Sequence, residues 1–152
     1  MGIGEAGMTD TIVFSVDGAC SGKKAACAAV ASRDGKIVAQ VSRFVRHADG
    51  YALAAELAAV GLAARLIDIL DDEAVVVEVD NPDVLRVIKD GYKPKQFSRI
   101  APGILTAAAD FDRLARPTYV VLPRNSTAGL RRADRLARAQ IWRRRQALTA
   151  KR

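Results

Sequence analysis

The chain has 152 residues, a length that suits one domain with one sizeable hydrophobic core. Half of its residues are apolar and 27% are charged, and no apolar run reaches the roughly 18 residues of a membrane-spanning helix. The formal net charge is +7, yet the segment from residue 131 to 152 alone carries +8, so the remainder is close to neutral. Such a basic segment suggests a polyanionic partner, although a solvated helix end would also explain it.

The N-terminus and the cysteines indicate the compartment. Residues 1–10 read as an extension without a function of its own, because Met8 is itself a candidate start. The extension lacks the features of a secretory signal and of a myristoylation site. Cys20 and Cys27 form neither a CxxC pair nor a disulfide framework. We therefore expect a cytoplasmic monomer that does not associate with a membrane.

In chain order, the sequence first predicts an antiparallel meander of three strands. The first strand is rich in β-branched and aromatic residues and ends at the chain-breaking pair Asp17-Gly18. Asp34-Gly35 predicts a two-residue hairpin turn, because both central positions of such a turn need positive φ angles. The three strands are predicted at residues 11–17, 24–32 and 37–45.

Helices and strands alternate in the remainder of the chain. An Ala- and Leu-rich helix precedes a near-continuous apolar strand, which is typical of the middle of a sheet. The order βββ-α-β-α-α-β-α predicts one α/β domain over residues 11–150, with a mixed five-stranded sheet flanked by helices. Helices are predicted at residues 51–70, 81–90, 98–115 (irregular at Pro102-Gly103) and 130–148, and strands at 74–80 and 118–122.

Four acidic residues occupy positions where a carboxylate calls for an explanation. Asp17 and Asp80 lie at strand ends, Glu56 lies in the helix expected to be buried, and Asp134 lies beside the apolar face of the last helix. Each has an ordinary explanation. Asp17 would be a turn residue and Asp80 a helix N-cap. Glu56 would lie on a solvated helix edge, and Asp134 would form a surface ion pair with Arg131 or Arg138. Together they indicate metal binding, because carboxylates that share one site need cations to neutralise them. Ligation by oxygen alone suits Mg²⁺ or Mn²⁺.

The residues around these acids resemble the motifs of the ribonuclease HI family. Segment 16–20 resembles its first-strand Asp-Gly motif, and segment 56–63 resembles its first-helix Glu motif. Segment 79–81 is similar to the fourth-strand Asp motif, and segment 132–137 to the last-helix motif in which an Asp precedes a Leu-Ala pair. The acids follow the family's order, and the match runs from about residue 11 to residue 140.

The resemblance implies a ribonuclease H-like fold and an endonuclease that hydrolyses the RNA strand of RNA–DNA hybrids, leaving 5′-phosphate ends. It also implies two Mg²⁺ ions, with Mn²⁺ as a substitute, and no organic cofactor. In that scheme Asp17 bridges both ions, Glu56 and Asp80 help to hold one, and Asp134 holds the other. One ion generates and aims the hydroxide, and the second stabilises the departing oxygen.

Nucleic-acid contacts are expected beside the acids, in the late loop and at basic positions. Lys93 and Lys95 lie near where some bacterial members insert a basic handle, which this chain lacks. The basic tail, Arg143-Arg144-Arg145 and Lys151-Arg152, is expected to contact phosphates without setting specificity. The predicted nucleic-acid-binding residues are Gly18, Ser21, Asn81, Lys93, Lys95, Arg124, Asn125 and Ser126.

Some positions depart from the family pattern. Ala52 and Leu53 stand where many members carry paired asparagines that help to read the RNA 2′-hydroxyls. Pro82 replaces a polar residue, and the late loop has no histidine. The sole histidine, His47, is interpreted as a surface loop residue. We therefore expect weaker discrimination between hybrid and double-stranded RNA than the family shows.

A non-catalytic nucleic-acid-binding module that retains the fold is the main alternative. The missing asparagines favour it, whereas the intact set of four acids opposes it. Proofreading-type exonucleases carry Asp-x-Glu on the first strand, but Gly18-Ala19 follows Asp17 here, and integrases place the helical Glu last. A serine or cysteine hydrolase would need His47 as its sole base, and no GxGxxG motif follows the first strand as a Rossmann enzyme requires.

Overall fold

The computed structural model describes residues 10–46, 48 and 50–150, with side chains up to residue 143. The interpretations of the 1–9 extension, of His47 and of Lys151-Arg152 lie outside the described residues, as do the side chains of residues 144–150. Among the described helices, none combines the length and apolar character that crossing a bilayer requires.

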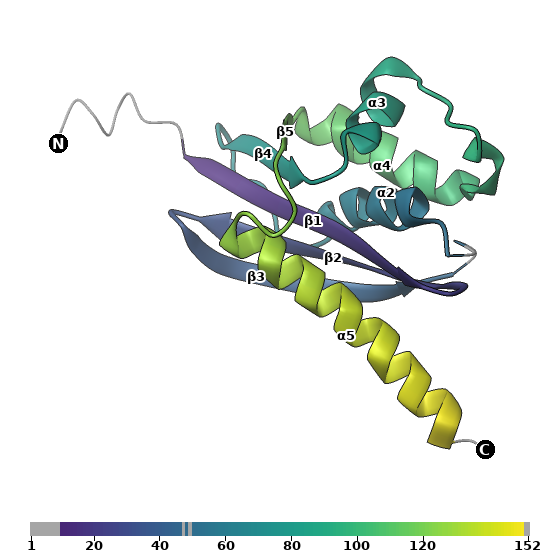
Figure 1. Ribbon diagram of the computed structural model, residues 1–152. Coiled ribbons are helices and arrows are strands. Elements are labelled where there is room, and N and C mark those ends of the chain that lie inside the picture. Colours follow the sequence, from purple (N-terminus) through teal and green to yellow (C-terminus); the bar gives the residue numbers. More distant parts are fainter. Residues whose placement is uncertain (1–9, 47, 49, 151–152) are drawn as a thin grey trace, which may run out of the picture.

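Five strands form one mixed sheet in the described part of the chain, in the order β3-β2-β1-β4-β5 (Figure 1). The first three are antiparallel neighbours: Thr11–Ser21 (β1), Lys24–Arg33 (β2) and Lys36–Val45 (β3). Ala74–Val79 (β4) runs parallel to β1, and Thr118–Val121 (β5) runs parallel to β4. The predicted mixed sheet with an initial meander is thereby confirmed.

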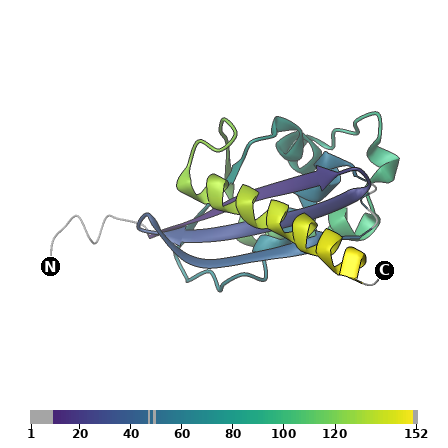
Figure 2. The ribbon, with the colours of Figure 1, turned by 60° about the horizontal axis from the view of Figure 1, so that its bottom comes forward.

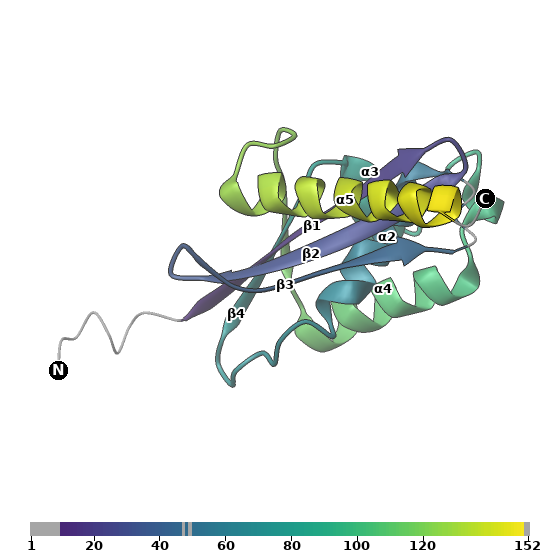
Figure 3. The ribbon, with the colours of Figure 1, turned by 90° about the horizontal axis from the view of Figure 1, so that it is seen from below.

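Helices cover both faces of the sheet. Ala52–Ala63 (α2), Pro82–Asp90 (α3) and Pro102–Ala115 (α4), with the short 3-10 helix Phe97–Arg99 (η1), lie on one side. Ala128–Ala150 (α5) crosses the opposite face of β1, β2 and β3, as Figures 2 and 3 show. The sheet is therefore the middle layer of three.

Strand β2 is buried on both faces because it lies between these two helical layers. Cys27 and Ala29 belong to the core on the α2 side of the sheet, whereas Ala26, Ala28 and Val30 pack against α5. The alanines that make this segment a weak strand by propensity are small enough to let helices approach on both sides. Tertiary packing thus decides the conformation of β2.

The turns that frame the meander follow local chemistry. Asp34 and Gly35 adopt φ angles of 52° and 74°, which confirms the predicted two-residue turn. The first strand continues past its expected end, because pairing with β2 persists from Asp17 opposite Ala28 to Ser21 opposite Lys24. Asp17 therefore lies inside β1 and is not the turn residue that would end it.

Two predicted helices are shorter than expected. The helix expected over residues 51–70 ends at Ala63, because the following segment is tied to β2: the Arg33 guanidinium donates to both Glu73 carboxylate oxygens, at 2.7 and 2.8 Å, and to the Asp68 carbonyl. The helix expected over residues 98–115 begins only at Pro102, since proline restricts the residue before it to extended backbone.

Helix α3 begins as predicted, and its cap identifies a role for Asn81. The Asn81 side chain accepts a hydrogen bond of 2.9 Å from the backbone N–H of Asp83, and Pro82 occupies the first turn. The N-cap of α3 is therefore Asn81 and not Asp80. The ordinary explanation of Asp80 as a capping residue is wrong, because its carboxylate does not cap α3.

Candidate metal centre and groove

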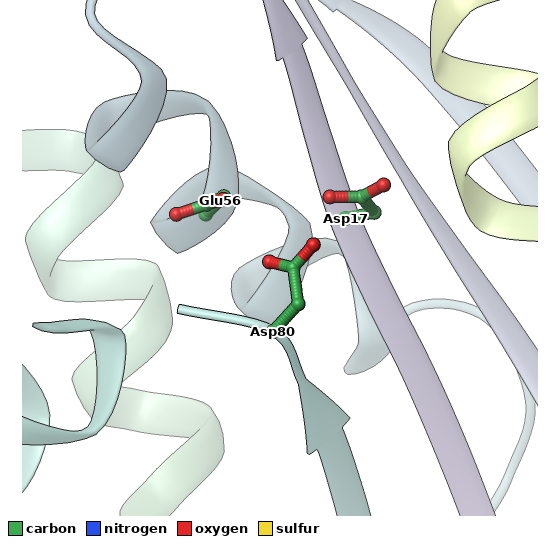
Figure 4. A group of neighbouring side chains, drawn as sticks. All are labelled: Asp17, Glu56 and Asp80. Atoms are coloured by element: carbon green, nitrogen blue, oxygen red, sulfur yellow. The ribbon is translucent and has the colours of Figure 1, made fainter. Parts of the chain in front are cut away.

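Three carboxylates converge at one end of the central strands. Asp17 lies in β1, Asp80 directly follows β4, and Glu56 lies on α2. One oxygen from each lies within 4.8 Å of the others, and Figure 4 shows the side chains gathered between the two strands and the helix. This is the arrangement that the sequence motifs predict for three of the four acids.

Backbone packing explains why these carboxylates meet. The parallel pairing of β1 and β4 sets Ser15 opposite Glu78, so Asp17 and Asp80, each two residues further on, emerge side by side. Helix α2 packs directly on β1 at Gly18, where an added Cβ would lie 2.7 Å from the backbone of Ala55 and Glu56. Gly18 thus permits the close approach that brings Glu56 to the strand ends.

The surroundings of these carboxylates disfavour their ionised, metal-free form and favour protonation or cation binding. Burial, together with the charges of Asp80 and Asp134, raises the pKa of Asp17 to about 7, against the opposing effect of a 2.9 Å hydrogen bond from the Gly18 N–H. Burial also raises the pKa of Glu56 to about 8, although Asn81 Nδ2 donates to Glu56 Oε2 at 2.7 Å and opposes the shift. This partly buried donor set, made of oxygen alone, fits a hard divalent cation.

Asp134 adjoins the group from the other side of β1. Only 13% of its side chain is exposed, and both its charge and a hydrogen bond that its carboxyl shares with Asp17 raise the pKa of Asp17. Its Oδ1 accepts a 3.0 Å bond from Arg138 Nε and lies 3.7 Å from Arg124. The expected ion pair with Arg138 thus exists, while Arg131 donates instead to the Asn125 carbonyl.

A partly buried polar network, which sequence reasoning missed, holds the start of α5. Ser15 and Thr127 donate to the same Glu78 oxygen at 2.6 and 2.8 Å, and the Leu130 N–H donates to Thr127 Oγ1. Gly129 lies so close to Ser15 that no Cβ fits between them. The network anchors α5 to β1 and β4 within two turns of Asp134. The only sequence signal is Glu78 itself, a charged residue inside an apolar strand.

A groove of about 700 Å³ opens over the carboxylates. Its lining includes six predicted functional residues and adds two others: Arg138, expected only as an ion-pair partner of Asp134, and Trp142, which was not predicted to be functional. The lining residues are Asp17, Gly18, Ala19, Cys20, Ser21, Ala52, Glu56, Asp80, Arg124, Arg138, Ile141 and Trp142.

The remaining predicted nucleic-acid residues lie elsewhere or act differently. Asn81 caps α3 and holds Glu56, whereas Asn125 adopts a φ of 57° in the exposed loop that Ser126 continues. Lys93 stacks over the Phe97 ring, 5.6 Å from its centroid, beside a small cavity between α3 and α4, and Lys95 is exposed in the same loop. A further cavity of about 660 Å³ lies between β3, α2 and α4, and among the residues that the structure describes no acidic one lines it.

No protein-family model matches the sequence, and no curated protein is significantly similar to it. Solved structures are similar. The N-terminal ribonuclease H domain of a Mycobacterium tuberculosis protein, fused to maltose-binding protein, gives a TM-score of 0.69 at 19% identity, over 91% of this chain and 99% of that one. Ribonuclease H1 from the archaeon Halobacterium salinarum gives 0.66 at 21% identity, over 86% and 97%. LC11 ribonuclease H1 from compost, solved with an RNA/DNA hybrid, gives 0.65 at 21% identity, over 87% and 97%.

These likenesses establish a class for the chain: it has the ribonuclease H fold, as the sequence motifs predict. Strand order, the parallel placement of β4 beside β1, and the helices on both faces all agree with that class. At these identities the likeness concerns the fold, and only the carboxylates and the groove bear on activity.

Proposed function

We propose that this protein is a ribonuclease H, an endonuclease that hydrolyses the RNA strand of RNA–DNA hybrids and leaves 5′-phosphate ends. The observation that carries the proposal is the meeting of Asp17, Glu56 and Asp80 within 4.8 Å at the floor of a groove, in a ribonuclease H fold. The LC11 enzyme, which shares the fold, was solved with an RNA/DNA hybrid. We further propose a single-domain cytoplasmic monomer.

The metal proposal assigns a role to each acid. Asp17 would take part in both ion sites, since Asp80 and Glu56 lie on one side of it and Asp134 adjoins it on the other. Two Mg²⁺ or Mn²⁺ ions would activate a water molecule and stabilise charge on the departing oxygen. Asn81 orients the Glu56 carboxylate through its 2.7 Å hydrogen bond. Arg138 holds Asp134 in place and adds positive charge to the groove wall.

Substrate reading is proposed to rest on backbone groups and on few side chains. Ala52 lines the groove, so the asparagine that many family members carry there would reach the substrate, and its absence removes a hydrogen-bonding group. Leu53 is buried in the core, so that substitution changes packing instead. Recognition of the 2′-hydroxyls then falls to the segment from Gly18 to Ser21, which also lines the groove.

A digestion experiment tests the proposed activity. Purified protein is incubated with end-labelled RNA–DNA hybrid, double-stranded RNA or double-stranded DNA, each with Mg²⁺, Mn²⁺ or EDTA. We expect the RNA strand of the hybrid to be cut with either metal, EDTA to abolish cutting, and the products to accept no further 5′-phosphate from a kinase until they are dephosphorylated. Cutting that persists in EDTA would contradict the proposal.

The non-catalytic binding module remains a second candidate because of one observation. Two arginines, Arg138 at 3.0 Å and Arg124 at 3.7 Å, already neutralise the Asp134 carboxylate that a second ion would need. If they keep that position, the protein binds hybrid without cutting it. Metal-independent hybrid binding, with no cleavage in either Mg²⁺ or Mn²⁺, would favour this candidate over the nuclease.

A further inference from the structure

Trp142 is an exposed aromatic side chain on the wall of the groove. It lies on α5, which runs past the edge of the sheet in Figure 1, and 60% of its surface is exposed. Trp142 stands one helical turn after Arg138, so both side chains occupy the same face of the helix. Both line the groove that contains the carboxylates.

Other exposed apolar residues do not share this position. Among the described large apolar side chains that are exposed, Leu114 at 74% and Leu70 at 56% line none of the cavities described above. Trp142 is the one member of that set that lines the groove. Leaving an indole in water forgoes the burial that a large aromatic normally gains, and an aromatic beside cations is the usual composition of a nucleic-acid-binding surface.

The spacing along α5 fits a nucleic-acid strand. Asp134, Arg138 and Trp142 recur every fourth residue, so about 12 Å of helix axis separates the first from the last. That distance corresponds to about three to four base pairs of duplex. A strand that followed α5 away from the carboxylates would pass Arg138 and reach the indole a few nucleotides away.

We propose that Trp142 packs its indole face against the sugars and base edges of the bound nucleic acid, three to four nucleotides from the cleaved phosphate. Arg138 contacts the phosphates between the two points. This contact surface on α5 supplies substrate affinity that the asparagine and the basic handle supply in other family members and that this chain lacks. The inference rests on the proposed nuclease function and adds a substrate-positioning residue to it.

Trp142 is the only tryptophan in the chain, so the protein carries its own probe. The Asp80→Asn variant, which we expect not to cut, is saturated with a short hybrid in Mg²⁺. Saturation is followed separately by the anisotropy of a fluorescein-labelled hybrid. Quenching of the tryptophan emission by acrylamide, a neutral quencher, is then measured with and without hybrid. We expect bound hybrid to lower the quenching constant at least about threefold, because it covers the indole.

Steady-state kinetics of single variants provide the second readout. Trp142→Ala should raise KM for the hybrid about tenfold with kcat changed less than about twofold, because the contact lies away from the reacting atoms. Trp142→Phe should restore most of the loss, since it keeps a π-face. The matched control, Leu114→Ala, removes an exposed apolar side chain outside the groove and should leave KM unchanged.

Each alternative outcome is distinguishable. Hybrid that binds and is cut, with no protection of Trp142 and no change in KM for Trp142→Ala, would overturn this inference and leave the nuclease intact. Absence of both binding and cleavage would refute the proposed function, and this inference with it. Protection from acrylamide that grows with protein concentration in the absence of nucleic acid would show that a second copy of the chain covers the indole, which also overturns the inference.

Discussion

The Asp17→Asn variant tests the electrostatic account of the carboxylate group most sharply. Asparagine keeps the size of the side chain and can still accept the hydrogen bond from the Gly18 N–H, but it carries no ionisable group. Only 4% of Asp17 is exposed, so solvent stabilises its negative charge little. The difference between variant and wild type therefore reports the free energy that the ionised carboxylate costs the metal-free fold.

The magnitude follows from the pKa. Burial and the neighbouring carboxylates raise the pKa of Asp17 from its ordinary 3.8 to about 7, so the folded protein binds this proton more tightly than the unfolded chain. This group therefore leaves stability unchanged below about pH 4, lowers it as the pH rises from about 4 to 7, and lowers it most above that range. A shift of this size corresponds to roughly 2 to 4 kcal/mol, allowing for partial hydration of the groove.

Thermal unfolding in EDTA at pH 4 and pH 8 is the assay. At pH 8 we expect Asp17→Asn to melt about 5 to 15 °C above wild type, given about 2 to 4 °C per kcal/mol for a chain of this size. At pH 4 the two melting temperatures should coincide. Adding Mg²⁺ at pH 8 should stabilise wild type and not the variant, because cation binding relieves the same repulsion. A variant that is equally or less stable than wild type at pH 8 would refute this account.

Three further predictions concern the helix anchor, the tail and substrate choice. Glu78→Ala leaves the hydroxyls of Ser15 and Thr127 without their shared acceptor, so we expect the free energy of unfolding, measured by urea titration, to fall by about 1 to 3 kcal/mol. We also expect Glu78→Ala to lower kcat. Glu78→Gln, which keeps an acceptor oxygen, should lie closer to wild type in both measurements. Replacing the three arginines at residues 143–145 by glutamine should weaken hybrid binding at low salt and flatten its salt dependence, measured by anisotropy; an unchanged slope would mean that they are only a solvated helix end. Rates on hybrid and on double-stranded RNA should differ less than in the family, and least in Mn²⁺; strict hybrid selectivity in both metals would show that the asparagine at the Ala52 position matters little.

The architecture could be predicted because its signals are local. Alternating strand and helix patterns, the Asp34-Gly35 turn and the apolar central strand each specify their own element. Boundaries failed where distant contacts decide them. Helix α2 stops at Ala63 because Arg33 binds the following segment, and β1 runs beyond Asp17 because β2 continues to pair with it. Neither partner can be identified from the neighbouring residues alone.

The candidate site divides in the same way. The four acids were found because motif order survives in the sequence, and the structure brings three of them within 4.8 Å of one another with Asp134 adjoining. Of the contacts that position them, the Asp134–Arg138 ion pair was expected from the four-residue spacing along one helix, whereas the hydrogen bond from Asn81 to Glu56 was not predicted. That hydrogen bond depends on how α2 meets the segment after β4. Periodicity in the sequence places a residue on one face of a helix or strand, but it does not identify the polar side chain that this face contacts on another element.

The central claim is that the carboxylate group is a metal-dependent catalytic centre, and one cleavage measurement tests it most directly. Wild type, Asp80→Asn and Asp83→Asn are compared on the RNA strand of a hybrid in Mg²⁺. Asp83 is the matched control, because it is three residues away, is paired with Arg86 at the surface and lies outside the group. We predict that Asp80→Asn retains less than about one thousandth of the wild-type rate, whereas Asp83→Asn cuts at nearly the wild-type rate. Mg²⁺-dependent cleavage by Asp80→Asn above that trace level, with a melting temperature equal to or above that of wild type, would contradict the assignment.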